Sequence, residues 1–113
     1  MIILSGPNKS IEALLGGAVA TNQLPIVANW VDVTTADQSV FAFGESDLTT
    51  SGATVVTVVA PPQASHTRTL KSMSIYNADT TSATVTVRLN NGISTRILVK
   101  ITLGVGSTLE YVE

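Results

Sequence analysis

The stretch SATVTVRLNNGISTRILVKITL, residues 82–103, constrains the fold more than any other part of the chain. Its β-branched residues alternate with polar residues on both sides of a glycine turn, which indicates a β-hairpin. A two-residue loop would mix apolar and polar side chains on both faces. A three-residue loop at 90–92 would place Val87 opposite Thr95 and make one face almost entirely apolar. We therefore predict the three-residue loop, with Gly92 in the left-handed conformation and a basic, threonine-rich outer face.

Further short β segments occur along the chain. Residues 24–33 and 68–78 alternate apolar and polar side chains, and residues 54–60 are β-branched enough to be buried on both faces. Residues 10–15 fit either an extended strand or a helical turn that Gly16-Gly17 would end. Short strands separated by turn signals every 8–12 residues or so are typical of all-β proteins. The sequence therefore predicts an antiparallel β-sandwich or jelly roll.

The N-terminal part of the chain is less regular. We expect residues 1–23 to form an extended N-terminal arm and residues 24–113 to form the β-sandwich module. The stretch 34–52 is weakly patterned, with a short strand or a packed loop at 40–43. From residue 54 onward the strands are expected to follow one another as a continuous meander.

Charge is unusually scarce in this chain. Charged residues make up 12% and hydrophobic residues 44% of its 113 residues, whereas ordinary soluble domains contain about 25% charged residues. This composition favours a permanent oligomer in which another chain covers part of the surface; a monomer coated with Thr and Ser is the alternative. The net charge of −2, with no charge run, argues against binding to nucleic acid or to a membrane surface.

The amino-acid sequence was also searched for the features of targeting signals. No apolar run approaches the length of a membrane span, and the start MIILSGPNKS lacks the positive region and long apolar stretch of a signal peptide. We therefore expect no membrane association and no Sec export.

Residues that could carry chemistry are few. His66 is the single histidine and cysteine is absent, so a zinc site is excluded. Neither Ser65 nor Ser72 lies in a nucleophile elbow, and we interpret His66 as a solvated loop residue. The spacings at 45–47 and 77–79 resemble the start of a calcium loop without its later glycine and glutamate, so turn capping is the preferred interpretation. We predict no enzyme activity and no catalytic, cofactor-binding or metal-binding residues, and no small-molecule substrate.

Three aromatic residues suit a contact surface instead. Trp30, beside Asn29 and Asp32, could form a sugar-binding platform, but packing in the core or at a subunit contact is the favoured interpretation. Phe41 and Phe43 lie in the weakly patterned stretch and would suit an interface.

The segments AVATNQLPIVANWVDVT, SMSIYNADTTSATVTVRLNNG and ILVKITLGVGSTLEYVE resemble small structural proteins of tailed-phage virions. The matching positions are 22–25, 75–79, 85–87 and 98–111, whereas residues 34–53 match little. These motifs are structural, so they indicate a virion module more strongly than they indicate which one.

Within this group the chain is most similar to capsid decoration, or cement, proteins. The resemblance implies a compact homotrimer bound to the major capsid protein on the capsid surface of the virion, after synthesis in the host cytoplasm. A tail or fibre adaptor module is the alternative, and a carbohydrate-binding module is a third. Strand addition by the arm and contacts by the aromatic residues would then involve Ile2, Ile3, Leu4, Leu14, Leu15, Trp30, Phe41 and Phe43.

Overall fold

A computed structural model describes all of residues 1–113 and contains nine β-strands and no helix. No segment of the structure is therefore a helix that could span a membrane. The strands are β1 (Ile2–Ser5), β2 (Ser10–Leu15), β3 (Pro25–Thr34), β4 (Val40–Thr49), β5 (Val56–Val59), β6 (His66–Tyr76), β7 (Ala83–Asn90), β8 (Thr95–Leu103) and β9 (Thr108–Val112).

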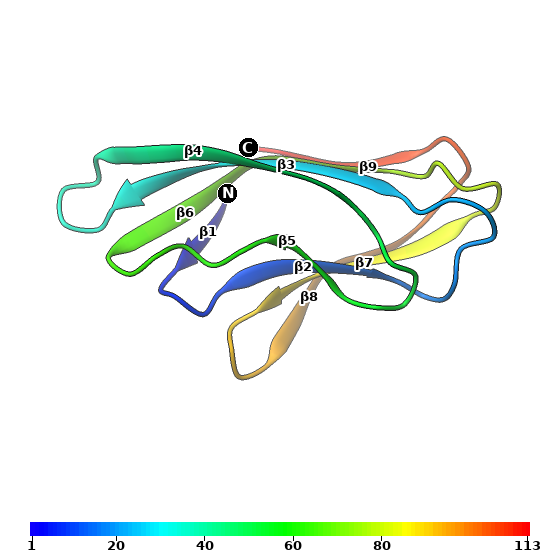
Figure 1. Ribbon diagram of the computed structural model, residues 1–113, viewed down its shortest axis with the longest axis horizontal. Coiled ribbons are helices and arrows are strands. Elements are labelled where there is room, and N and C mark those ends of the chain that lie inside the picture. The colour runs from blue at the N-terminus through cyan, green and yellow to red at the C-terminus, as the bar shows by residue number, and fades with distance from the viewer.

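The strands form two antiparallel sheets that pack face to face (Figure 1). The five-stranded sheet has the order β1–β6–β3–β4, and β9 pairs with β6 as well, while the four-stranded sheet has the order β5–β2–β7–β8. Inward side chains from both sheets, such as Ile11, Ile26, Ile75 and Val85, are fully buried between them. The predicted β-sandwich is therefore confirmed.

Four connections between the sheets lie at one end of the sandwich, which we call the crossover end. They span residues 16–24, 50–55, 77–82 and 104–107, and each joins a strand of one sheet to a strand of the other. The chain from residue 54 onward is therefore not a meander, because it passes between the sheets three times. Because each passage places the next strand in the other sheet, strands pair with partners that are distant in the sequence, such as β6 with β9.

The expected N-terminal arm is corrected by the structure. Strand β1 pairs with β6, and β2 lies at the centre of the four-stranded sheet between β5 and β7. Leu4 and Ile11 are fully buried and Leu15 is almost so, whereas a free arm would leave all three in water at a cost of about 1.5–3 kcal/mol each. Residues 1–23 are therefore part of the sandwich, and no boundary between arm and module lies at residue 23.

The hairpin of β7 and β8 has a different register from the predicted one. Its loop spans 91–94, and Val87 lies opposite Val99 rather than Thr95, with an irregularity after Val87 that leaves an extra residue on β8. The Asn91 side chain accepts hydrogen bonds from the backbone N–H groups of residues 93 and 94, at 2.9 and 2.8 Å. This turn chemistry sets the longer loop. Gly92 has the predicted positive φ, at 89°.

Strand β4 is longer than expected. It covers ten residues, including 45–47, so Glu45 and Asp47 are strand residues and not turn caps. Gly44 lies opposite Trp30, and a Cβ atom at this position would come within 2.5 Å of the indole ring. Glycine inside this strand therefore makes room for Trp30, although it weakens the β pattern that the sequence presents.

Candidate interaction surfaces

Asn77 and Asp79 tie the connections of the crossover end together. The buried Asn77 amide donates hydrogen bonds to the carbonyl oxygens of Thr81 and Leu103, both at 3.0 Å, and its Oδ1 accepts one from the Asp79 N–H. The Asp79 carboxylate accepts hydrogen bonds from the backbone N–H groups of residues 20, 21, 22 and 80 at 2.8–3.1 Å. The two side chains thus perform the turn-capping role that was inferred for residues 77–79.

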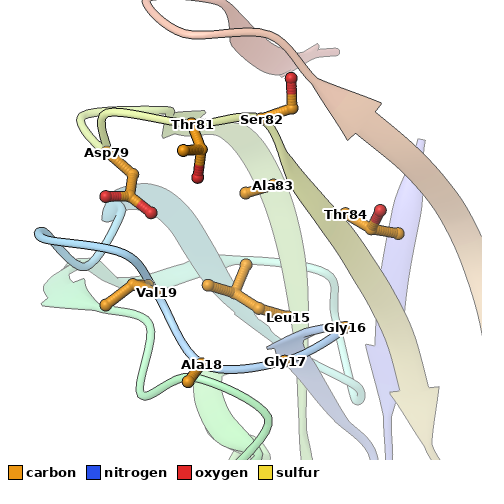
Figure 2. Close-up of a pocket in the computed structure, with 10 residues that line it drawn as sticks. All are labelled: Leu15, Gly16, Gly17, Ala18, Val19, Asp79, Thr81, Ser82, Ala83 and Thr84. Carbon is orange, nitrogen blue, oxygen red and sulfur yellow. The ribbon is translucent and has the colours of Figure 1, made fainter.

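A cavity of about 240 Å³ lies beside this cluster, between residues 16–19 and 79–84 (Figure 2). Asp79 lines the cavity, but its carboxylate oxygens are already paired with backbone N–H groups. The cavity has no second charged side chain among its lining residues. The hydrogen-bonding capacity of the Asp79 carboxylate is therefore used within the fold.

The Asp79 carboxylate makes the stability of the fold depend on acid pH. Its backbone hydrogen bonds, first those from Asn22 and Ala20, lower the pKa of Asp79 from 3.8 to about 2. A carboxyl group whose pKa is lower in the folded state stabilises the fold above its unfolded pKa, and this stabilisation is lost as pH falls through the folded value. We expect the Tm to be level above pH 5, by this linkage, and to fall between about pH 4 and pH 2.

The same transition in an Asp79→Asn variant should be shallower, and its Tm should approach that of the wild type as pH falls. The Thr34 hydroxyl lowers the pKa of Asp37 to about 2 as well, so Asp37→Asn should also make the transition shallower and measures the share of the acid dependence that belongs to Asp37. A Tm difference between wild type and Asp79→Asn that does not change between pH 6 and pH 2 would contradict the role given to Asp79.

His66 is not the solvated loop residue that was expected. It begins β6 and is half-buried, and its Nδ1 lies 2.8 Å from the Ala64 carbonyl oxygen. Its ring packs against Phe41 with ring centroids 4.4 Å apart. No acidic or nucleophilic side chain is hydrogen-bonded to the ring, so the structure gives His66 a packing role.

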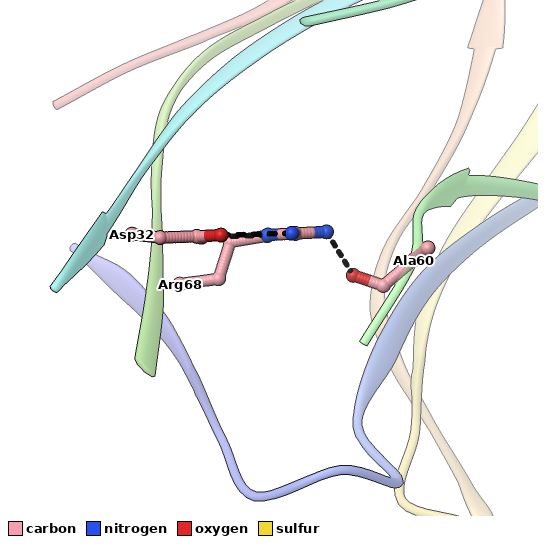
Figure 3. Close-up of polar contacts among 3 residues, drawn as sticks. All are labelled: Asp32, Ala60 and Arg68. Atoms are coloured by element: carbon pink, nitrogen blue, oxygen red, sulfur yellow. Dashed lines mark hydrogen bonds and ion pairs between the residues drawn. The ribbon is translucent and has the colours of Figure 1, made fainter. Parts of the chain in front are cut away.

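Asp32 and Arg68 form a buried ion pair at the end of the sandwich opposite the crossover end. Arg68 Nε and Nη2 donate to the two carboxylate oxygens of Asp32, at 2.8 and 2.9 Å, and Nη1 donates to the Ala60 carbonyl at 2.7 Å. Figure 3 shows the guanidinium group between Asp32 and Ala60. Because Ala60 directly follows β5 of the other sheet, Arg68 ties the two sheets together.

Trp30 belongs to the same inner cluster. Its ring lies over Gly44, and the Arg68 guanidinium carbon is 4.6 Å from the ring centroid. Asn29 is on the opposite face of β3, where its amide donates to the Ser72 hydroxyl. The three residues named for a sugar-binding platform therefore do not converge on one surface.

The outer face of the five-stranded sheet carries an uncharged apolar surface, which we call the Phe43 face. Two rows of paired residues form it, and neither contains a charged side chain. Phe43 is 79% exposed, and Val40 and Ile3 are 59% and 50% exposed. The rows are Ile3–Thr69–Val31–Phe43 and Ser5–Thr67–Val33–Val40. Large apolar side chains exposed together on one sheet face mark a candidate interaction site.

A second exposed region is the side of the sandwich where β8 and β9 lie. An apolar groove of about 240 Å³ opens there between the sheets. Tyr111 lines this groove, and its buried hydroxyl has no hydrogen-bond partner. Strand β8 forms the free edge of its sheet and exposes Ile97 and Leu98. Sequence reasoning missed this surface because the predicted register turned Ile97 toward the core.

The predicted contact residues are divided between core and surface. Leu4 and Leu15 are corrected to core residues, because β1 and β2 belong to the sheets. Ile2 is partly buried and lines the groove, Leu14 is half-buried on the outer face of the four-stranded sheet, and Trp30 is packed inside. The exposed members of the predicted set are Ile3, Phe41 and Phe43.

Comparisons with protein-family models, with curated proteins and with solved structures found no match to this chain.

Proposed function

We propose that this protein is a structural component of a tailed-phage virion, a decoration protein that binds the major capsid protein and stabilises the outside of the capsid. The Phe43 face is the observation that carries the proposal, because it is uncharged and exposes Phe43, Val40 and Ile3 on a hydrogen-bonded sheet. The sequence resemblance to virion structural proteins supplies the partner and the location. The proposed role is non-enzymatic, and the protein would act at the capsid surface as a homotrimer.

Several physical features support a cement role. The two sheets are tied at the crossover end by Asn77 and Asp79 and at the other end by Arg68, so the module would keep its shape under load. An interface whose core is an aromatic side chain on a flat sheet needs little rearrangement on binding. Many copies on one shell would add avidity to modest single contacts.

A tail or fibre adaptor is the second candidate. It would use the same fold and the same Phe43 face, and it would differ in location and copy number. The exposed edge of β8 favours this candidate, because a free strand edge can accept a strand from a neighbouring module.

Binding to empty shells tests the proposal. Shells assembled from the major capsid protein of the phage that encodes this chain should sediment together with the purified protein. Phe43→Glu should weaken this binding at least about tenfold, because the change buries a charge at the centre of the contact. The fold should be unaffected, since Phe43 is 79% exposed.

Ile93→Glu is the matched control. Ile93 is 97% exposed and lies in the hairpin loop of the other sheet, so the same change there should leave shell binding unaltered. Wild-type protein that stays in the supernatant, or two variants that weaken binding equally, would contradict the proposal.

A further inference from the structure

Two long edge strands of the sandwich are open for pairing. Strand β8 is one outer strand of the four-stranded sheet, and β4 is one outer strand of the five-stranded sheet. The opposite edges are formed by the shorter strands β5, β1 and β9, of four, four and five residues. The backbone of residues 40–48 and of residues 95–102 makes no hydrogen bond beyond those to β3 and β7. The strands are ten and nine residues long, so each could form a ladder along most of the other.

The two edges carry opposite charges. Glu45 and Asp47 lie on one face of β4. Arg96 and Lys100 lie on opposite faces of β8, because Arg96 is opposite Leu89 and Lys100 is opposite Thr86, so one of the two cations can share a face with the acids. None of these four takes part in an ion pair, whereas the other strand arginines are paired with Asp32 and Glu12. Glu110 lies on β9 beside the groove and forms no ion pair. Its negative charge partly offsets the positive charges of β8 on this side of the sandwich.

These charges discriminate between the possible pairings. Two β8 strands side by side would bring Arg96 and Lys100 near their own copies, and two β4 strands would do the same with Glu45 and Asp47. Like charges across a strand pair are destabilising, whereas opposite charges stabilise it. Among the pairings of these two long edges, β8 with β4 is the one that brings opposite charges together. Apolar side chains support it, because Ile97 and Leu98 on β8 and Val40 and Phe41 on β4 are exposed.

We propose that copies of this chain associate head to tail, with β8 of one copy adding as an edge strand to β4 of the next. The occupant of the β8 edge is thus a second copy of this chain. An interface between two different surfaces repeats around a ring when the rotation closes and otherwise extends as a filament. A closed ring of three copies would be the homotrimer of the proposed function. The ring size rests on that proposed function, whereas the pairing of β8 with β4 does not.

Light scattering after size exclusion tests the pairing. At low salt the wild type should have the mass of three 11.8 kDa chains, and the mass should fall as salt shortens the Debye length from about 10 Å at 0.1 M. Arg96→Glu with Lys100→Glu should give a monomer, and so should Glu45→Lys with Asp47→Lys. Combining all four substitutions restores opposite charges and the wild-type net charge, and it should restore association.

Mixing the two double variants is a second measurement that does not depend on the fourfold variant folding. Each is monomeric alone by like-charge repulsion, and together they should associate through opposite edges. A wild type that is monomeric at every concentration and salt, or a double variant of β8 that still associates, would overturn the proposal, as would mixtures that remain monomeric. A monomer that still sediments with shells would refute the pairing alone, whereas an association without shell binding would refute the proposed function alone.

Discussion

Replacing Arg68 with methionine should lower the free energy of unfolding by about 3–5 kcal/mol, the cost expected when one member of a buried ion pair is removed. Asp32 is 5% exposed, so its carboxylate would be left buried and without its partner. The Ala60 carbonyl would lose the donor that joins the loop after β5 to the five-stranded sheet. Urea denaturation followed by tryptophan fluorescence would report the change, because Trp30 packs against Arg68.

Two controls separate the buried pair from a general effect of charge. Lys71 and Glu113 form an exposed pair at 3.2 Å, and Lys71→Met should cost less than about 1 kcal/mol. The double variant Asp32→Leu with Arg68→Met removes both charges and should recover much of the stability lost in Arg68→Met. If Arg68→Met and Lys71→Met were equally stable, the tie between the sheets would have to be assigned elsewhere.

Replacing Asn77 with alanine should cost roughly 3 kcal/mol or more, since each buried polar group left unpaired costs about 1–3 kcal/mol. The Asn77 side chain is fully buried and serves three backbone groups, which belong to Asp79, Thr81 and Leu103. These groups belong to the connection after β6 and to the end of β8. Thermal unfolding by circular dichroism would measure the loss of Tm.

Asn22→Ala is the control within the same cluster. The Asn22 amide makes one exposed hydrogen bond, to the Ala78 carbonyl at 3.1 Å, and its loss should cost about 0.5–1.5 kcal/mol at most. An Asn77→Ala variant as stable as Asn22→Ala would mean that water replaces the lost hydrogen bonds and that the crossover end is held by other contacts.

The alternation of β-branched residues was enough to predict the fold class, but not the pairing of the strands. The β7–β8 hairpin shows why. Alternation alone favoured a short loop that kept one face apolar, yet the Asn91 side chain stabilises a longer loop. The loss of apolar alignment costs little there because β8 is an edge strand, so Ile97 can face solvent beside Arg88. Turn chemistry therefore outweighs alternation where burial is weak.

The N-terminal strands illustrate a second limit. Residues 2–5 are too short to be recognised as a strand, and their partner in β6 lies more than sixty positions away. The neighbouring sequence does not distinguish a Leu4 that is buried within its own chain from one that contacts another chain. Strand β4 was equally hidden, because Gly44 and the acids after it break the β pattern. The reason for Gly44 is the Trp30 ring across the strand pair, which is a long-range contact.

The candidate surfaces could be predicted only in part, because they also depend on contacts between residues that are distant in the sequence. Phe41 and Phe43 were identified as contact residues from their place in an irregular stretch, and both are exposed. Val31 and Ile3 complete the Phe43 face only because β1, β6, β3 and β4 lie in register. The strand order is likewise needed to recognise that the charges of β4 and β8 lie on two free edges of the sandwich.

Gold labelling of intact virions by an antibody against this chain, viewed by electron microscopy, tests the central claim most directly. If the proposed function is right, tailed-phage particles whose genome encodes the chain should carry many gold grains distributed over the head and none on the tail, as expected for a decoration protein repeated across the capsid surface. Grains confined to the tail or its fibres, or virions that carry no label while the free protein is found in the lysate, would contradict the account.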